Sequence, residues 1–354
     1  MFADDTNIFV TGRSEEQAYT RANIVVNELY EYLIANELHI NIGKSVHMHF
    51  HPHLSNDARK TCARTRSHHY TLRLGSSKLK KVDTVKFLGV IIDDELSWEP
   101  QVEYIKQKLN SSIIIIKRIR KFIPESEYMK LYNALFKSHL SYCISTWGGI
   151  SSHKLESIFS IQKRCIRLLF GTKFTYDHAE YYETCARART YEVNMQENNY
   201  TLEHTKPLFN KHSILTLRHL YVQHTFVELF KVMKYRIPIS VHDMFPCQPG
   251  KMRSSCSTLR IRIPIITLEK SRYNYIFRAT SLWNSLVGSI FVKEEPNSAG
   301  ILVPGSDMCT DLLFTPLSYV KGKLKSKLYD IQRTRTEGDG TSSSEWNAGN
   351  FYIL

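Results

Sequence analysis

The chain has 354 residues, of which 42% are hydrophobic, and this is enough for two or three domains with cores of their own. Its 47 Lys and Arg residues outnumber its 34 Asp and Glu residues, which gives a formal net charge of +13. Such an excess favours a polyanionic partner, foremost nucleic acid, although a solvated basic surface would produce the same balance.

The cysteines and the hydropathy pattern exclude several classes of protein. Seven cysteines, without closely spaced pairs, predict neither a disulfide framework nor a zinc finger and favour a reducing compartment. The first residues lack the basic and apolar regions of a secretory signal, and no apolar run approaches the roughly 20 residues that span a bilayer. We therefore expect a soluble protein of the cytoplasm or nucleus, with no membrane partner.

The first predicted element is an acidic turn between two apolar segments. Asp4 and Asp5 lie between Phe2-Ala3 and Ile8-Phe9-Val10. Carboxylates held at a tight turn between strands can bind Mg²⁺ ions that bridge nucleotide phosphates. An ordinary turn is the alternative, because aspartate side chains commonly bond to nearby backbone in turns.

A helix and several short strands follow. Ser14 and Gln17 form a capping-box-like start to a helix that Asn36 ends, with an apolar stripe that includes Val25, Val26 and Tyr32. Short strands are predicted over 38–41 and 46–50, around the turn Gly43-Lys44-Ser45. Residues 52–70 form a loop, and 72–74 with 85–92 alternate as a further hairpin that ends in an acidic turn.

From Ser97 the pattern becomes helical and basic. Apolar residues recur every three or four positions in three stretches: from Val102 to Ile119, from Tyr128 to Trp147 after Pro124, and from Leu155 to Leu168 before Gly171. The spacing predicts a small three-helix bundle. Its remaining surface is basic. Lys117, Arg118, Arg120 and Lys121 lie at the end of the first helix, and Lys163, Arg164 and Arg167 lie on the third helix.

Beyond Lys173 the pattern is less regular. Helices are predicted over 215–235 and 273–290, separated by a proline-punctuated stretch. Arg253 to Ile266 mixes arginines with β-branched residues and predicts a basic strand or an extended arm. The tail from Arg333 is predicted to be disordered.

Four motifs in this order resemble the C-terminal half of reverse transcriptases from LINE-type (non-long-terminal-repeat) retrotransposons. The resemblance is carried by Phe2-Ala3-Asp4-Asp5, by the segment 38–45 with its Asn41 and Lys44, by the segment 85–90 with Leu96 and Trp98, and by the basic segment 161–167. The first motif departs from the family in having Phe2 where a tyrosine is usual.

The resemblance implies a role for each motif. Asp4 and Asp5 would be catalytic ligands of Mg²⁺, and Lys44 would stabilise or protonate the leaving pyrophosphate. Phe87, Leu88 and Gly89 would form the primer grip. Lys117, Arg118, Arg120, Lys121, Lys163, Arg164 and Arg167 would bind nucleic-acid phosphates. The implied partners are an RNA template, a DNA primer and deoxynucleoside triphosphates.

The implied fold is α+β: a partial polymerase palm of antiparallel hairpins and a helix, followed by a mainly helical thumb bundle and a mixed, less ordered C-terminal region. The expected domains are a truncated palm with the primer-grip hairpin over 1–96, a thumb over 97–172, a retroelement C-terminal region over 173–332 and a disordered tail over 333–354.

The implied activity is RNA-directed DNA synthesis. Because the fingers and the strand with the other metal-binding Asp would lie upstream of Met1, we expect the chain to be inactive alone. The alternative function is a non-catalytic, retroelement-derived nucleic-acid-binding protein that uses the helical bundle and Arg253, Arg260 and Arg262.

A metal site at a histidine-rich segment is a second alternative. His47, His49, His51 and His53 alternate, so the first three could share one strand face, and imidazole suits zinc or copper. Pro52 interrupts the run, and half-exposed strand histidines would give the same pattern.

Overall fold

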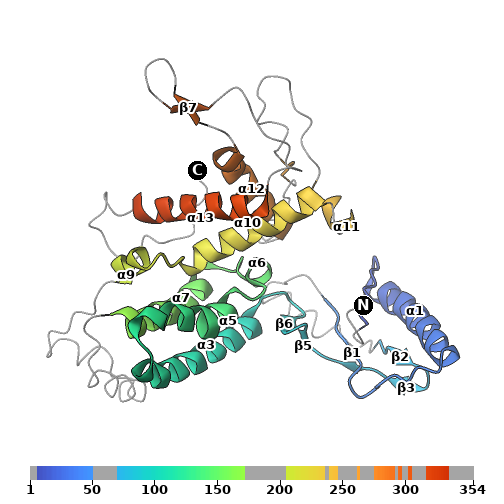
Figure 1. The fold of residues 1–354 in the computed structure, drawn as a ribbon. Helices are drawn as coiled ribbons and strands as arrows, with labels where there is room; N and C mark the ends of the chain where they lie inside the picture. The colour runs from blue at the N-terminus through green and yellow to red at the C-terminus, as the bar shows by residue number, and fades with distance from the viewer. Residues whose placement is uncertain are drawn as a thin grey trace. The chain divides into compact units, whose positions relative to one another are not determined.

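The computed structural model describes residues 6–50, 70–171, 205–235, 239–245, 261–263, 275–291, 294–296, 302–304 and 316–334. The chain divides into two compact units, Met1–Gln101 and Val102–Leu354. Helices and small two-stranded sheets occur together, which confirms the α+β class at a coarse level (Figure 1). Asp4, Asp5, Arg253 and Arg260 lie outside the described residues.

The first unit begins with a capped helix, α1 (Glu15–Ala35). The Ser14 hydroxyl accepts a hydrogen bond from the Gln17 backbone N–H at 3.2 Å, and the Gln17 side chain accepts one from the Arg13 N–H at 2.7 Å. Asn36 ends the helix, as predicted, and Glu37 then takes a left-handed backbone with φ 56°. The start and end of this helix were therefore encoded by local side-chain chemistry.

The strands of the first unit pair in three separate two-stranded sheets. β1 (Val46–His47) pairs in parallel with β4 (Lys80–Lys81), and β2 (Arg73–Leu74) pairs antiparallel with β3 (Ser77–Lys78). β5 (Thr84–Phe87) pairs antiparallel with β6 (Val90–Asp93).

Two strand predictions were wrong. Residues 72–74 do not pair with 85–92, because each segment finds a closer partner across a short turn of its own. Residues 38–41 form no strand; Asn41 instead closes a turn in which its backbone and side-chain oxygens accept bonds from the Lys44 N–H.

A small apolar core joins α1 to the β2–β3 hairpin. Tyr19 and Val26 of α1 are buried together with Leu72, Leu74 and Leu79. The predicted stripe on this helix is only partly buried: Val25 is 37% exposed and Tyr32 is 62% exposed. The hairpin is too narrow to cover the whole apolar face of a helix of 21 residues.

The second unit starts with α3 (Glu99–Ile119), whose first residues belong to the first unit. Val102, Ile105, Leu109 and Ile116 of the predicted face are buried. α7 (Ser152–Phe170) is the predicted third helix and ends before Gly171.

The predicted second helix, 128–147, is helical throughout except for an interruption at residues 142–143, where Cys143 has a positive φ of 49°. It consists of α4 (Tyr128–Leu131), the π-helical segment η3 (Tyr132–Lys137), α5 (Ser138–Ser141) and, after the interruption, α6 (Ile144–Trp147). Two short 3₁₀ turns, η1 (Arg120–Phe122) and η2 (Glu125–Glu127), connect α3 to it.

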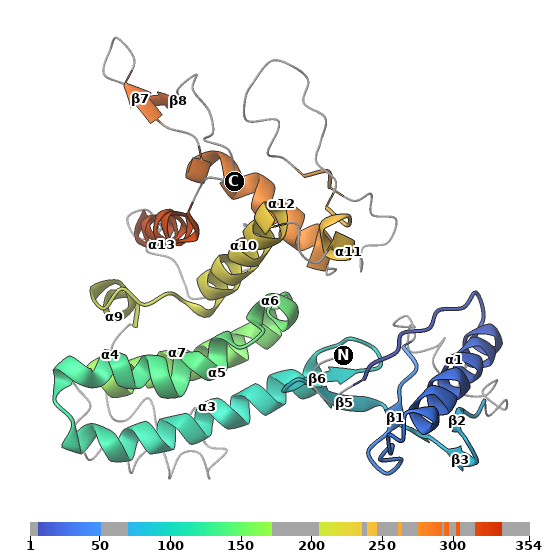
Figure 2. The ribbon, with the colours of Figure 1, turned by 45° about the vertical axis from the view of Figure 1, so that its right-hand side comes forward.

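The later helices pack around α10 (Leu217–Tyr235), whose residues are buried on most sides. α6, α7, α12 and α13 all pack against it, so it is the central helix of the unit (Figures 1 and 2). The other elements are α9 (Thr205–Lys211), α11 (Ile239–His242), α12 (Tyr275–Phe291), the hairpin of β7 (Glu294–Pro296) and β8 (Leu302–Pro304), and α13 (Leu317–Thr334).

The helices over 215–235 and 273–290 agree with the prediction to within two residues, whereas α13 was not predicted. α13 buries Val320, Leu324 and Leu328 at a spacing of four residues. This helix was missed in the sequence, because lysines at every second position from 321 to 327 interrupt the apolar stripe. Within the described parts of the chain, no helix is both long enough and apolar enough to cross a membrane.

Candidate nucleic-acid interface

The predicted primer-grip residues form the tip of the β5–β6 hairpin. Phe87 pairs with Val90, so Leu88 and Gly89 are the two residues of the connecting loop. Both have positive φ, 45° at Leu88 and 83° at Gly89, as in the type I′ turns that suit the twist of a tight hairpin.

Leu88 is an unusual residue for this position. The first place of such a turn normally holds Asn, Asp or Gly, since a left-handed backbone costs other residues roughly 1–2 kcal/mol. Its side chain is also 38% exposed. A costly backbone together with an exposed apolar side chain is the combination that functional sites often show.

The base of the same hairpin is bonded to the start of α3. The Asp93 carboxylate is buried and accepts hydrogen bonds from the Ser97 and Trp98 N–H groups at 2.7 and 2.9 Å. The buried Gln101 side chain accepts one from the Ile91 N–H at 2.8 Å. These bonds fix the hairpin against the turn that leads into α3 and against Gln101 in its first turn.

Lys44 is exposed on the turn that follows Ile40. Its backbone N–H bonds to Asn41, so the turn itself is well defined. Because Asp4 and Asp5 lie outside the described residues, the predicted juxtaposition of Lys44 with these acids stays a prediction.

The basic residues at the end of α3 and in η1 differ in exposure and in their contacts within the protein. Arg118 and Lys121 are exposed, and Lys117 is half-buried. The Arg120 guanidinium donates to the Leu168 carbonyl and lies 5.6 Å from the Tyr128 ring centre, so it joins η1 to α7. At least one guanidinium N–H of Arg120 is therefore already used within the fold.

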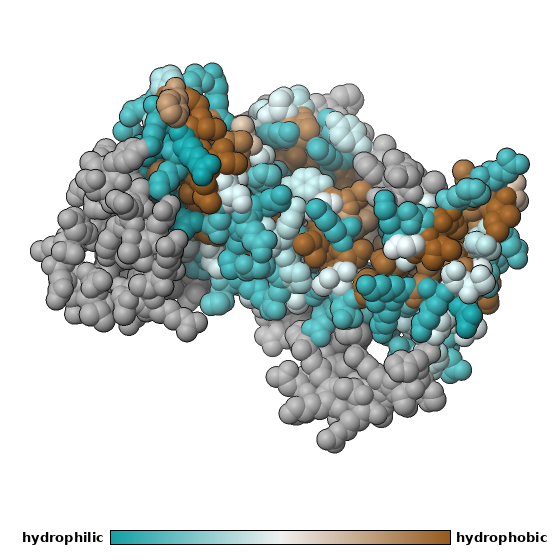
Figure 3. Space-filling model, turned by 90° about the horizontal axis from the view of Figure 1, so that it is seen from below, coloured by the Kyte–Doolittle hydropathy of each residue, from teal (hydrophilic) through white to brown (hydrophobic). Residues whose placement is uncertain are grey.

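The predicted basic residues of α7 are close to those of α3. The exposed Arg164 donates to the Asn110 side chain of α3, and Lys163 forms a salt bridge of 3.0 Å with Glu156. Arg167 is half-buried. The structure thus brings the two predicted basic segments onto neighbouring helices, with the charge of Lys163 neutralised locally. Figure 3 shows hydrophobic and hydrophilic residues intermixed on the face that it displays.

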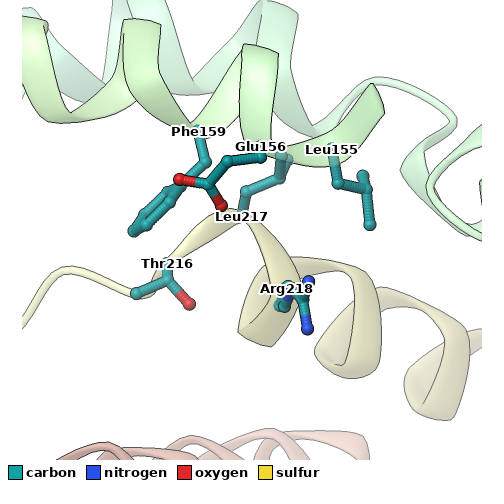
Figure 4. A pocket seen from close by; sticks show the side chains of 6 residues that line it. All are labelled: Leu155, Glu156, Phe159, Thr216, Leu217 and Arg218. Atoms are coloured by element: carbon teal, nitrogen blue, oxygen red, sulfur yellow. The ribbon is translucent and has the colours of Figure 1, made fainter. Parts of the chain in front are cut away.

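A shallow hollow, open to solvent, lies between α7 and α10 (Figure 4). It is lined by Leu155, Glu156, Phe159, Thr216, Leu217 and Arg218. The hollow contains none of the predicted site residues.

In the described part of the chain, no group of three or more His, Cys, Asp or Glu side chains is arranged so that it could hold a metal ion. Asp4, Asp5, His51 and His53 lie outside it. His47 and His49 both pack their rings on Tyr19, with ring centres 5.8 and 6.0 Å away.

A group of basic residues that the sequence analysis did not single out lies in the second unit. Lys137 of η3, His224 of α10, and Lys321 and Lys325 of α13 lie within electrostatic range of one another. Burial, and then Lys137, Lys321 and Lys231, lower the pKa of His224; burial, and then Lys325, lower the pKa of Lys137. The only sequence signal was the alternation of lysines over 321–327.

Comparison of the chain with protein-family models, curated proteins and solved structures finds no match.

Proposed function

We propose that the chain carries palm and thumb elements of a LINE-type reverse transcriptase and binds a primer–template duplex. The β5–β6 tip would contact the primer, and the basic surface of α3, η1 and α7 would contact duplex phosphates. The observation that carries the proposal is the left-handed, exposed Leu88 at the tip of a hairpin that is fixed to the first turn of a basic helix.

The hairpin supports this role because its base and strands are held rigidly, while its tip presents Leu88 for contact with a partner. Asp93 and Gln101 hold its base, and the paired strands hold its length. Leu88 lies in the loop between Phe87 and Val90 and is not among the buried core residues. An apolar side chain at this position can pack against a sugar or a base edge of a primer, while Gly89 lets the backbone approach a phosphate.

The test of the grip is a variant that favours the hairpin and removes the apolar tip. Leu88→Asn should keep or strengthen the turn, because Asn-Gly is a preferred type I′ pair. We expect duplex affinity, measured by fluorescence anisotropy, to fall about tenfold, since an apolar contact is lost. Unchanged affinity in a variant of unchanged or higher stability would rule out the grip.

The test of the thumb surface is the salt dependence of duplex binding. Arg118→Gln combined with Lys121→Gln should reduce the slope of log affinity against log salt by about 0.9 for each lost phosphate contact. Lys130→Gln is the matched control, because this lysine is exposed and already pairs with Glu127 at 2.8 Å. Equal slopes in all three proteins would contradict the proposal.

The catalytic part of the proposal rests on the family resemblance of Asp4, Asp5 and Lys44. Their carboxylates and amine are the groups that Mg²⁺ and pyrophosphate require. Primer extension on an RNA template, with Asp4→Ala as control, tests this part separately. Salt-dependent duplex binding without Asp4-dependent synthesis would favour the alternative of a non-catalytic nucleic-acid-binding protein.

A further inference from the structure

α1 is apolar on two sides, and its own unit covers only one of them. Tyr19 and Val26 are buried in the small core with the β2–β3 hairpin, which lies along that side of the helix (Figure 1). On the other side Ile24 is 54% exposed, Val25 is 37% exposed and Tyr32 is 62% exposed. Neighbouring apolar side chains left in solvent in this way mark an interaction surface.

Five residues make up this exposed side, and we refer to them as the α1 stripe: Arg21, Ile24, Val25, Glu28 and Tyr32. A step of about 100° per residue places all five within one arc of about 100° around the helix. The centre of that arc is about 160° from the direction shared by Tyr19 and Val26. A partner of the stripe would therefore leave the core of the unit undisturbed.

The two charged residues of the stripe have no opposite charge beside them on the helix. Neither Arg21 nor Glu28 has an oppositely charged residue three or four positions away. They are seven residues apart, which is about 10.5 Å along the helix axis and too far for a pair with each other. Arg21 donates one hydrogen bond of 3.0 Å to the Thr11 carbonyl, but this acceptor carries no net charge.

The stripe is complementary to itself when it is reversed. Arg21 lies three positions before Ile24, and Glu28 lies three positions after Val25, so the midpoint of the pattern falls between Ile24 and Val25. If two such helices pack antiparallel about a two-fold axis at this midpoint, Arg21 of each helix lies level with Glu28 of the other. Reciprocal matching of this kind is what a two-fold interface requires, whereas parallel packing in register would bring like charges together.

We propose that the α1 stripe is the interface of a homodimer, in which a second copy of this chain packs its own α1 antiparallel to the first. Two Arg21–Glu28 pairs flank a central apolar contact made by Ile24 and Val25, and Tyr32 extends the contact at each end. The interface uses none of the residues of the proposed nucleic-acid surface, and it holds whether or not the chain binds nucleic acid.

The size of the stripe and the charge of the chain set the conditions of the test. Five residues are fewer than the roughly 20–30 on each side of a standard interface, so we expect association in the micromolar range. The net charge of +13 opposes association. Salt at about 0.15 M screens that long-range repulsion more strongly than it screens pairs that association removes from water.

The experiment is sedimentation equilibrium of the whole chain at concentrations from about 1 to 100 μM. The mass should rise with concentration from 41.2 kDa towards twice that value. Arg21→Glu and Glu28→Arg each bring like charges together across the two-fold axis, and each should weaken association by about tenfold or more. Glu16→Arg is the matched control, because it makes the same charge change about 120° around the helix from Glu28 and should leave association unchanged.

An equal mixture of the two single variants is the most specific arm. In the mixed dimer every acidic side chain of the stripe meets a basic one, so association should return. It should also return in a chain that carries both substitutions. A variant that had merely lost its fold would not be rescued by mixing, and circular dichroism checks the helix content of each protein.

Three results would overturn the proposal: an unsubstituted chain that stays at 41.2 kDa over the whole range, association that neither single substitution weakens, or a loss in both variants that mixing does not reverse. The first would assign the stripe to a partner of another sequence. The second would place the contact between copies on another surface, and the third would show that the two charges do not face each other.

Discussion

The Asp93 carboxylate accepts a hydrogen bond of 2.9 Å from the backbone N–H of Trp98, a residue whose own φ is 62°. A second bond of 2.7 Å comes from Ser97. Together they satisfy two backbone donors of the turn that precedes α3, in which Leu96 and Trp98 are left-handed.

Replacing Asp93 should therefore destabilise the hairpin–helix junction. We expect Asp93→Ala to cost about 1–3 kcal/mol of unfolding free energy, because two turn N–H groups lose their acceptor, and Asp93→Asn to cost less because the amide oxygen still accepts. Urea unfolding monitored by tryptophan fluorescence measures both. An Asp93→Ala variant with an unchanged free energy of unfolding would show that the turn is held by other contacts.

Gln162 should be among the polar residues on which the second unit depends most. Its buried amide donates to the Tyr132 hydroxyl and to the Leu215 carbonyl, both at 3.0 Å, and accepts from the Leu217 N–H at 2.9 Å. Gln162→Leu would leave those groups buried without a partner and should cost about 3 kcal/mol. Tyr132→Phe removes one of the bonds and should cost about 1 kcal/mol, which makes it the matched comparison in the same urea titration.

His224 should make stability fall at mildly acidic pH. Burial and the lysines around it lower its pKa in the folded state below the usual 6.5, so the unfolded chain binds the proton more readily. Its stabilising contribution is therefore complete above 6.5 and is lost as the pH falls from there through the folded pKa. The free energy of unfolding should therefore decrease as the pH falls below about 6.5.

His224→Gln should make that decrease smaller. His212, whose pKa burial also lowers, remains in this variant and sets the residual slope. Urea titrations at several pH values compare the two proteins, and identical slopes would exclude His224 as a contributor.

Gly322 should be a site where a substitution stabilises the protein. It lies inside α13, and a Cβ atom there would meet nothing within 4 Å. Gly322→Ala should raise the unfolding free energy by about 0.5–1 kcal/mol, because alanine restricts the unfolded chain and favours helix. Thermal unfolding is the measurement; a lower melting temperature would mean that α13 is not helical at this residue. Gly75, with φ 59° and the Tyr30 ring in the way, is the contrasting position where alanine should destabilise.

Local sequence signals determined the elements whose stabilising contacts are close in the chain. Ser14 and Gln17 define the start of α1, Asn36 its end, and the apolar spacing of α3, α7 and α10 their buried faces. The basic character of the helices that follow was likewise readable, because it depends on a few neighbouring residues. The tight turn at Leu88-Gly89 was missed, because 85–92 was predicted as a single strand arm.

Only the tertiary structure decided which residues meet across long separations. Strand 72–74 was assigned to the wrong partner, since pairing depends on turn geometry and not on alternation alone. The second predicted helix contains a π-helical stretch over 132–137 and is interrupted by the left-handed Cys143, and the apolar spacing of its sequence indicated neither feature. Lys137 lies within electrostatic range of His224 and of Lys325, although no local pattern relates these positions, because α5 and α13 pack on the same central helix.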